Sequence, residues 1–333
     1  MNATSPDALA PWRGQRLAYI SAFMPPTVAD GIVLEAALGW SSDVQALLLI
    51  APDDPIGPQQ RIGWLRELAP RIHILPVEPS PPPGDEPLRS PRLQGLVKGL
   101  RAAPPEALVG PGLRDRELAA ALGLPYLPVD TGAWHDIDAA AVLRRPLTHW
   151  DALPPAVRTH FLKRVVLLGP ESTGKTTLAG DLARAFGTVW VAEYLRLYLD
   201  AKGGVCEPDD LPRVVAGHQV MEATLARRAT RVIICDTDPL MTAVYSRFYY
   251  GTLPAWLGDA AGARRADHYR LLDCDVPWVA DPQRDAPHAR GVILGLCREE
   301  LERRRLPFTV ISGGWTQRFT AARTIVESLL REE

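Results

Sequence analysis

One glycine-rich segment has residue types and spacing that suit phosphate binding. Residues 169–176 have the sequence GPESTGKT, a full match to the pattern G-x-x-x-x-G-K-[ST], and they lie between a predicted strand at 163–168 and a predicted helix at 175–186. In this pattern the loop N–H groups and the helix N-terminus bind phosphate, the lysine reaches the β- and γ-phosphates, and the last hydroxyl binds Mg²⁺. The predicted nucleotide-binding residues are Gly169, Pro170, Glu171, Ser172, Thr173, Gly174, Lys175, Thr176, Thr177 and, further along the chain, Arg290.

Lysine is scarce in this chain, which makes Lys175 informative. Lysine and arginine together number 37, and only four of these residues are lysine. A compact ammonium fits a phosphate-binding loop as a point charge, whereas a planar guanidinium fork would not. The alternative is a glycine-rich turn that binds no nucleotide, but both flanks and the retained lysine favour ATP and Mg²⁺ as cofactors.

Acidic residues follow two further predicted strands, which indicates a site for a phosphoryl acceptor. Asp236 and Asp238 follow the strand at 231–235, and residues two apart on a strand point to the same side, so both carboxylates are expected to project together toward the nucleotide. We predict that Asp236 holds Mg²⁺ and that Asp238 contacts a hydroxyl of the acceptor. Glu193, after the strand at 189–192, is a candidate general base or hydroxyl-orienting residue. Solvated strand ends are the alternative interpretation.

A polar, proline-containing segment follows the next predicted strand. Residues 275–284 have the sequence DVPWVADPQR, and Arg290 lies shortly beyond. A mobile lid at this place would supply Arg284 and Arg290 to the charge on the transferring phosphoryl group. Trp278 suits a flat, cationic acceptor through stacking and cation–π attraction. A charged surface loop is the alternative. The predicted substrate-binding residues are Glu193, Tyr194, Arg196, Asp238, Trp278 and Asp281.

The order of the predicted elements indicates an α/β protein of two domains with largely parallel sheets. The first domain is placed at 1–150, a connecting segment at 151–162 and the second domain at 163–333. Strands are expected at 16–22, 44–51, 71–77, 107–110, 126–129, 163–168, 189–192, 231–235, 269–274 and 308–311. Helices are expected at 61–68, 93–101, 114–122, 175–186, 211–228, 239–249, 289–305 and 315–331. The many prolines at 76–91 predict an extended surface loop.

The composition is that of a globular protein, with 47% hydrophobic and 23% charged residues. A net charge of −2 provides no global basic field, so neither nucleic acid nor a membrane is expected as a partner. The four cysteines lack metal-ligand spacing and are interpreted as buried thiols in a reducing compartment. We expect a cytoplasmic protein, because we find neither a signal peptide nor an apolar run near the ~20 residues of a membrane helix.

The second domain resembles the ribosylnicotinamide kinase domain of NadR-type proteins, the nicotinamide-nucleotide adenylyltransferase/ribosylnicotinamide kinase family. The matching stretches are GPESTGKTTLA, VWVAEYLRLYL, AGHQ, ICDTD, YYG and DVPWVADPQR. The resemblance implies a P-loop kinase fold and transfer of the ATP γ-phosphate to the 5′-hydroxyl of nicotinamide riboside, which gives nicotinamide mononucleotide. The sequence departs from the family at Pro282, where similar lids usually have glycine.

The first domain takes the place of that family's adenylyltransferase domain, for which the resemblance implies a Rossmann-like nucleotidyltransferase fold. The family carries F-x-P-x-H-x-G-H, with histidines for the ATP phosphates, but here residues 23–30 are FMPPTVAD, with Thr27 and Asp30 at the histidine positions. In the later motif I-S-x-T-x-x-R, which corresponds to 137–143, serine, threonine and arginine are all replaced. One lost transition-state donor typically costs ~3 kcal/mol, so we expect this domain to have lost adenylyl transfer.

Together these features predict an ATP- and Mg²⁺-dependent kinase whose substrate is nicotinamide riboside. The predicted catalytic residues are Lys175, Glu193, Asp236, Asp238 and Arg284. One alternative is a bifunctional enzyme that keeps adenylyl transfer. Another is a pyridine-nucleotide sensor without chemistry, which the acceptor carboxylates argue against. A homo-oligomer is compatible with the sequence.

Overall fold

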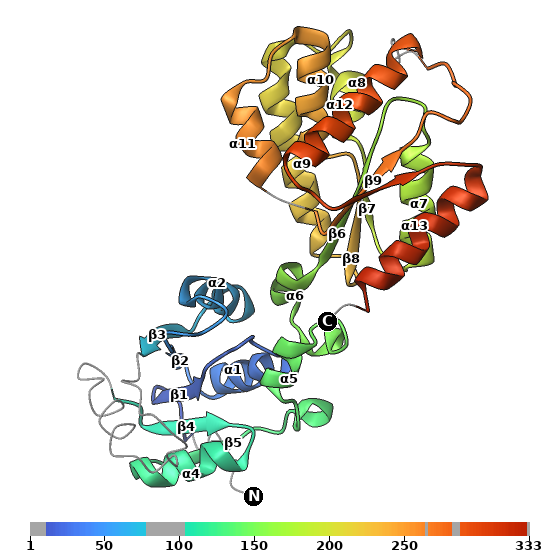
Figure 1. Ribbon diagram of the computed structural model, residues 1–333. Helices are drawn as coiled ribbons and strands as arrows, with labels where there is room; N and C mark the ends of the chain where they lie inside the picture. Colours follow the sequence, from blue (N-terminus) through green and yellow to red (C-terminus); the bar gives the residue numbers. More distant parts are fainter. Residues whose placement is uncertain (1–10, 78–103, 264–265, 282–286, 332–333) are drawn as a thin grey trace, which may run out of the picture. The chain divides into compact units, whose positions relative to one another are not determined.

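The chain is an α/β protein with two parallel sheets, as predicted (Figure 1). The computed structural model describes residues 11–77, 104–263, 266–281 and 287–331. It divides the chain into two compact units, Met1–His160 and Phe161–Glu333. The predicted helix at 93–101 and most of the proline-rich segment lie outside the described residues.

The first unit is a sheet with the strand order β3-β2-β1-β4-β5. Its strands are β1 (Arg16–Ser21), β2 (Asp43–Leu49), β3 (His73–Val77), β4 (Ala107–Gly110) and β5 (Tyr126–Pro128). Its described helices are α1 (Val28–Trp40), α2 (Pro58–Leu68), α4 (Leu113–Leu122), α5 (Ala139–Arg144) and α6 (Pro155–Phe161), with short turns η2 (Gly132–Trp134) and η3 (Trp150–Ala152). The segment predicted to connect the domains therefore folds largely as α6.

The second unit is a sheet with the strand order β10-β9-β6-β8-β7. Its strands are β6 (Lys163–Leu168), β7 (Trp190–Val191), β8 (Val232–Asp236), β9 (His268–Leu272) and β10 (Phe308–Ile311). Its helices are α7 (Lys175–Ala185), α8 (Tyr194–Lys202), α9 (Leu211–Ala226), α10 (Pro239–Tyr250), α11 (Ala255–Ala263), α12 (Arg290–Arg303) and α13 (Trp315–Leu329), with short turns η4 (Pro208–Asp210) and η5 (Pro287–Ala289). Helices α8 and α11 were not predicted from the sequence.

Helices cover both faces of the second sheet. Helices α7 and α13 pack against one face, where Leu178 and Val326 join a buried cluster with Val165 and Leu167 of β6. Helices α9, α10 and α12 lie on the other side in Figure 1. Successive residues of a strand face opposite sides, so Arg164 turns toward α9, away from the α7/α13 cluster. This leaves one charged group of β6 buried beneath α9.

The parallel strands bring the predicted site residues to one edge of the second sheet. The carboxyl ends of β6, β7, β8 and β9 lie at the same edge, and open sheets of this kind bind ligands there. The glycine-rich loop follows β6, Glu193 follows β7, Asp236 ends β8 and the lid segment follows β9.

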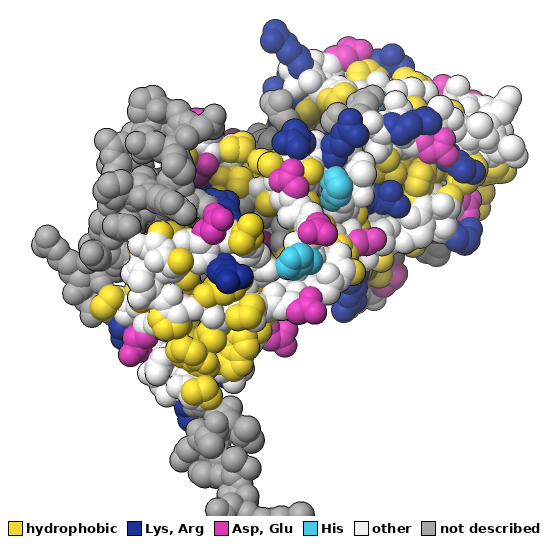
Figure 2. All heavy atoms as spheres, turned by 90° about the horizontal axis from the view of Figure 1, so that it is seen from below, with side chains coloured by type: hydrophobic (Ala, Val, Ile, Leu, Met, Phe, Trp, Pro, Cys, Tyr) yellow, Lys and Arg dark blue, Asp and Glu magenta, His cyan; other side chains and the backbone are white. Residues whose placement is uncertain are grey.

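The charged side chains form a mixed surface. Figure 2 shows acidic and basic side chains interspersed on one face of the molecule. No helix in the described part of the chain has the length and hydrophobicity needed to cross a membrane.

Candidate functional site

The glycine-rich loop wraps around the ammonium group of Lys175. Lys175 Nζ donates hydrogen bonds to the carbonyl oxygens of Gly169 and Pro170, each at 2.9 Å. Gly169 and Gly174 have φ of 141° and 86°, a region that suits glycine. A Cβ at Gly169 would lie 2.8 Å from the carbonyl oxygen of Leu272, so the turn requires glycine there. The loop is therefore a tight turn that requires glycine, with the buried Lys175 ammonium at its centre, a geometry that is compatible with the predicted phosphate-binding role.

The Thr176 hydroxyl contacts the end of the neighbouring strand. Thr176 Oγ1 donates to Asp236 Oδ2 at 2.5 Å, and Asp236 is fully buried. Burial and the nearby Glu193 carboxylate raise the pKa of Asp236 to about 6, against the opposing effect of Lys175. The second oxygen, Oδ1, has no hydrogen-bond partner among the described residues. A hydroxyl and a carboxylate oxygen are ligands that Mg²⁺ accepts, so Thr176 and Asp236 fit the predicted metal role.

Asp236 and Asp238 do not project together, and the prediction that they would is wrong. Strand β8 ends at Asp236, and Thr237 has a positive φ of 71°, so the alternation of strand side chains does not continue. Asp238 instead caps helix α10, where its Oδ1 accepts from the backbone N–H of Leu240 at 2.9 Å. Its Oδ2 lies 3.3 Å from Arg164 Nη1. One carboxylate therefore faces the glycine-rich loop and the other lies under α9.

A buried charge cluster that the sequence did not reveal surrounds Asp238. Arg164 makes a bidentate contact to Glu222, with Nε–Oε1 at 2.7 Å and Nη2–Oε2 at 2.9 Å. The Tyr269 hydroxyl donates to Asp238 Oδ2 at 3.1 Å. Burial lowers the pKa of His218, whose Nε2 lies 3.7 Å from Glu222 Oε2. Asp238 is thus held by an arginine, a tyrosine and a helix N-terminus.

Glu193 is the N-cap residue of helix α8 and is joined to the lid segment through Arg196. Arg196 Nε lies 3.2 Å from Glu193 Oε2, and Arg196 Nη1 lies 3.2 Å from Asp281 Oδ2. The Tyr194 ring packs on Gly217 of α9, where a Cβ would approach it to 2.1 Å. The three predicted residues Glu193, Arg196 and Asp281 therefore form one chain of ion pairs.

The start of the lid segment contacts the glycine-rich loop. The Val279 N–H donates to Ser172 Oγ at 2.7 Å, and Arg290 Nη2 donates to the carbonyl oxygen of Ser172 at 3.4 Å. The Arg290 guanidinium also lies 6.0 Å from the centre of the Trp278 ring. Trp278 lines neither of the two cavities described below, so its contact with an acceptor stays a prediction. Arg284 and Pro282 lie outside the described residues.

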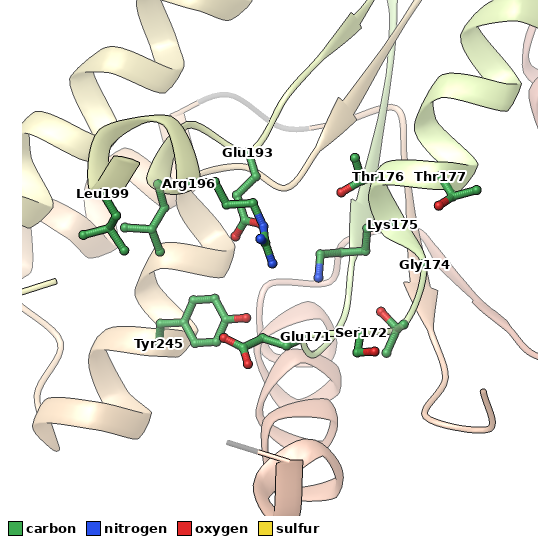
Figure 3. Close-up of a pocket in the computed structure, with 12 residues that line it drawn as sticks. Glu171, Ser172, Gly174, Lys175, Thr176, Thr177, Glu193, Arg196, Leu199 and Tyr245 are labelled. Carbon is green, nitrogen blue, oxygen red and sulfur yellow. The ribbon is translucent and has the colours of Figure 1, made fainter. Parts of the chain in front are cut away.

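Two adjoining cavities meet at the glycine-rich loop. The smaller, of about 100 Å³, is lined by loop residues together with Glu193 and Arg196 (Figure 3). The larger, of about 430 Å³, is lined mostly by tyrosines and aliphatic side chains, with Asp238 and His218 at its polar part. The residues that line both are Glu171, Glu193, Leu195, Leu199 and Tyr245. A nucleotide phosphate chain and an acceptor can therefore meet beside Glu193.

The degenerate motifs of the first unit serve as helix caps. Thr27 and Asp30 form a capping box at α1, in which Asp30 Oδ2 accepts from both the N–H and the hydroxyl of Thr27 at 2.7 Å. The Tyr19 hydroxyl donates to Asp30 Oδ1 at 2.8 Å. Asp138 caps α5 and accepts from the N–H of Ala140 at 2.9 Å. These side chains are engaged in local structure.

A family model and two curated proteins are similar to parts of this chain. Residues 164–318 match a family model described as an AAA domain. The trifunctional NAD biosynthesis/regulator protein NadR of Salmonella typhimurium is 27% identical over 220 residues, which is 64% of this chain and 54% of the relative. The Escherichia coli protein of the same description is 28% identical over the same coverage. The chain therefore spans about half the length of the curated relatives it matches.

Solved structures are similar over almost the whole chain. A NadR protein in complex with NAD and AMP-PNP has a TM-score of 0.76 at 20% identity and covers 96% of this chain and 98% of its own. A NadR protein in complex with NR has a TM-score of 0.77 at 20% identity, with coverages of 95% and 96%. At this level of identity the likeness establishes the fold of the chain.

Proposed function

Because this chain is a relative of NadR-type proteins, we propose that its second unit is an ATP-dependent kinase that phosphorylates the 5′-hydroxyl of nicotinamide riboside to give nicotinamide mononucleotide. The observation that carries the proposal is the junction of the two cavities at Glu193 and the glycine-rich loop. A phosphate chain in the smaller cavity and a nucleoside in the larger one would bring the γ-phosphate and the hydroxyl together.

The loop residues would bind the triphosphate. The N–H groups of the loop and the N-terminus of α7 supply donors, and Lys175, now held by two carbonyl oxygens, would turn to the β- and γ-phosphates. Thr176 and Asp236 would hold Mg²⁺, which when bound supplies positive charge to the phosphate oxygens. Arg196 and Arg290, at the edge of the loop, are placed to stabilise charge on the transferring group.

Glu193 would act on the acceptor hydroxyl. Its carboxylate lines both cavities, and it would accept the proton of the 5′-hydroxyl as that oxygen attacks the γ-phosphorus. The bond from the γ-phosphorus to the bridging oxygen breaks, and ADP leaves. The proposed binding residues for the nucleoside are Asp238 and Tyr194, together with the more distant Asp281 and Trp278. Arg284 of the lid is proposed to stabilise charge on the transferring phosphoryl group.

The first unit is proposed to have no adenylyltransferase activity, because Thr27 and Asp30 are engaged with each other at the cap of α1. A bifunctional enzyme and a sensor without chemistry are the alternatives. The proposal places the enzyme in the cytoplasm with a small molecule as its partner and involves no nucleic acid or membrane. A homo-oligomer stays a prediction.

A nucleoside panel tests the kinase assignment directly. Purified protein with ATP and Mg²⁺ should phosphorylate nicotinamide riboside in preference to adenosine and cytidine, with ADP formation and product mass as readouts. Lys175→Ala should abolish turnover, because the loop loses its central cation. Preference for adenosine or cytidine would refute the acceptor assignment, and ATP binding without turnover of any acceptor would favour the sensor.

A further inference from the structure

Glu171 has a charge that does not suit its position in a phosphate-binding loop. It is the third residue of the loop, where backbone N–H groups and Lys175 would gather the negative charge of a triphosphate. A carboxylate directed at those phosphates would repel them. The carboxylate is therefore expected to point away from the bound phosphates.

The Glu171 side chain points away from the phosphate cradle. In Figure 3 its carboxylate is directed toward the Tyr245 ring, on the opposite side from Thr176 and Thr177. Glu171 lines the larger cavity as well as the smaller one, and Tyr245 does so too. Burial raises the pKa of Tyr245 well above its ordinary value, with further contributions from the carboxylates of Glu193 and Glu171. The Tyr245 hydroxyl therefore interacts electrostatically with the carboxylates of Glu171 and Glu193 at the junction of the cavities.

The larger cavity has negatively charged groups and no cationic side chain among its described lining residues. Its carboxylates are Glu171, Glu193 and Asp238. Arg196 lines only the smaller of the two cavities. The larger cavity contains His218, and burial lowers the pKa of this histidine. The aromatic lining residues are Tyr194, Tyr245, Tyr249 and Tyr250. Aromatic faces and carboxylates together favour a flat ligand with positive charge and disfavour one with a carboxylate or a phosphate.

We propose that Glu171 is a specificity-determining residue of the acceptor cavity, not an ATP ligand, and that it selects an acceptor with a cationic ring over one that carries a negative group. This inference rests on the proposed kinase function. It assigns to a loop carboxylate the discrimination between nicotinamide riboside and nicotinic acid riboside, which differ only in an amide and a carboxylate on the same pyridinium ring.

The test compares these two acceptors with the full-length enzyme and Glu171→Gln, which keeps the shape and removes the charge. We expect the wild type to prefer nicotinamide riboside. Glu171→Gln should lower kcat/KM for that acceptor about tenfold, mainly by raising KM. It should also lower the ratio of kcat/KM for nicotinamide riboside to kcat/KM for nicotinic acid riboside by at least about fivefold, which corresponds to ~1 kcal/mol. The KM for ATP should stay within about twofold of the wild type.

Two further variants make each outcome decisive. Glu171→Asp keeps the charge and should retain the preference even if kcat falls. The control Glu327→Gln removes a carboxylate of α13 that lines neither cavity and should leave the acceptor preference and both KM values unchanged. Thermal unfolding of each variant identifies any loss of folded protein. If Glu171→Gln raised the KM for ATP and left the acceptor preference unchanged, the inference would be overturned and Glu171 would be assigned to the nucleotide site. Failure of the wild type to phosphorylate either riboside would overturn the proposed function, and the inference with it.

Discussion

Thr176 Oγ1 lies 2.5 Å from Asp236 Oδ2, although the two residues are 60 positions apart in the chain. The contact joins the first turn of α7 to the end of β8, because β6 and β8 are parallel neighbours in the sheet. It places the hydroxyl of the glycine-rich motif on a buried carboxylate with a raised pKa. The pair is therefore the position at which we propose that a divalent cation binds, beside the glycine-rich loop.

This pair predicts how activity depends on pH and Mg²⁺. The pKa of Asp236 is raised to about 6, so the carboxylate is protonated below that pH and ionised above it. In the proposed metal role only the ionised carboxylate of Asp236 would bind Mg²⁺, so the proposed kinase activity should fall as the pH decreases through about 6. Because metal and proton compete for the same oxygens, a higher Mg²⁺ concentration should shift this acid limb to lower pH. Profiles of kcat/KM at two Mg²⁺ concentrations measure the shift, and an acid limb that stays in place would exclude Asp236 as its source.

Asp236→Asn should make the protein more stable while removing activity. At pH 7 without metal the folded chain carries a buried charge, and the raised pKa corresponds to a cost of about 2–3 kcal/mol that the amide would avoid. The gain should shrink as the pH falls toward the ordinary carboxyl pKa, because the wild-type group is then protonated. Urea unfolding with EDTA at pH 7 and at about pH 4.5 checks the sign. Equal stability of both proteins at pH 7 would contradict the assignment.

Gly174→Ala should abolish nucleotide binding for a local steric reason. A Cβ at Gly174 would lie 2.3 Å from the Trp315 ring, and the positive φ of 86° disfavours any side chain. We expect the affinity for an ATP analogue to fall at least about 100-fold, because the loop must change its shape. Gly180→Ala, within the helix α7 that follows Gly174, is the matched control, since nothing lies within 4 Å of its added Cβ. It should bind normally and be slightly more stable.

A double variant distinguishes the steric clash with the Trp315 ring from the backbone strain at residue 174. If the ring contact were the sole cause, Gly174→Ala combined with Trp315→Ala would restore binding. We expect only partial recovery, because the backbone strain remains. Calorimetric titration of both variants distinguishes these outcomes.

Arg164 should be more important for stability than exposed ion pairs of this chain. Arg164→Met would leave Glu222 and Asp238 as buried carboxylates without their arginine, a change that typically costs about 3–5 kcal/mol. Arg184→Met removes an exposed pair with Asp181 and should cost less than about 1 kcal/mol. Denaturant unfolding of the two variants provides the comparison. Similar losses would mean that the buried cluster is not a stabilising unit.

The glycine-rich loop could be predicted because its motif consists of consecutive residues. Eight adjacent positions between a strand and a helix define the cradle, and Lys175 lies where the pattern requires. All five strands of the second sheet were likewise predicted, because short apolar runs alternate with amphipathic segments. Glu193 was found for the same local reason, since it lies two residues after the end of β7.

Features that depend on a single backbone angle or on distant pairing could not be predicted. The separation of Asp236 from Asp238 follows from the positive φ of Thr237, which no alternation rule reveals. The bidentate contact between Arg164 and Glu222 joins residues 58 positions apart, and nothing in either local sequence indicates it. Helix α1 was missed because its first turn was interpreted only as a degenerate motif.

The cap of α1 provides a prediction for the first unit. Thr27→Ala should destabilise this unit by about 1 kcal/mol, because the N-terminal N–H groups of α1 lose an acceptor. Glu35→Ala, on the exposed side of the same helix, is the control and should have a smaller effect. Restoring the family's histidines with Thr27→His and Asp30→His should also lower stability, since Asp30 loses its bonds to Thr27 and Tyr19. Calorimetry measures the stability of each variant.

The same variants test adenylyl transfer. Neither the wild type nor the Thr27→His/Asp30→His double variant should form NAD from nicotinamide mononucleotide and ATP, because the second motif of the family, at residues 137–143, also lacks its donors. NAD formation by the wild type at a rate comparable to its kinase activity would show that the unit has kept adenylyl transfer by other contacts.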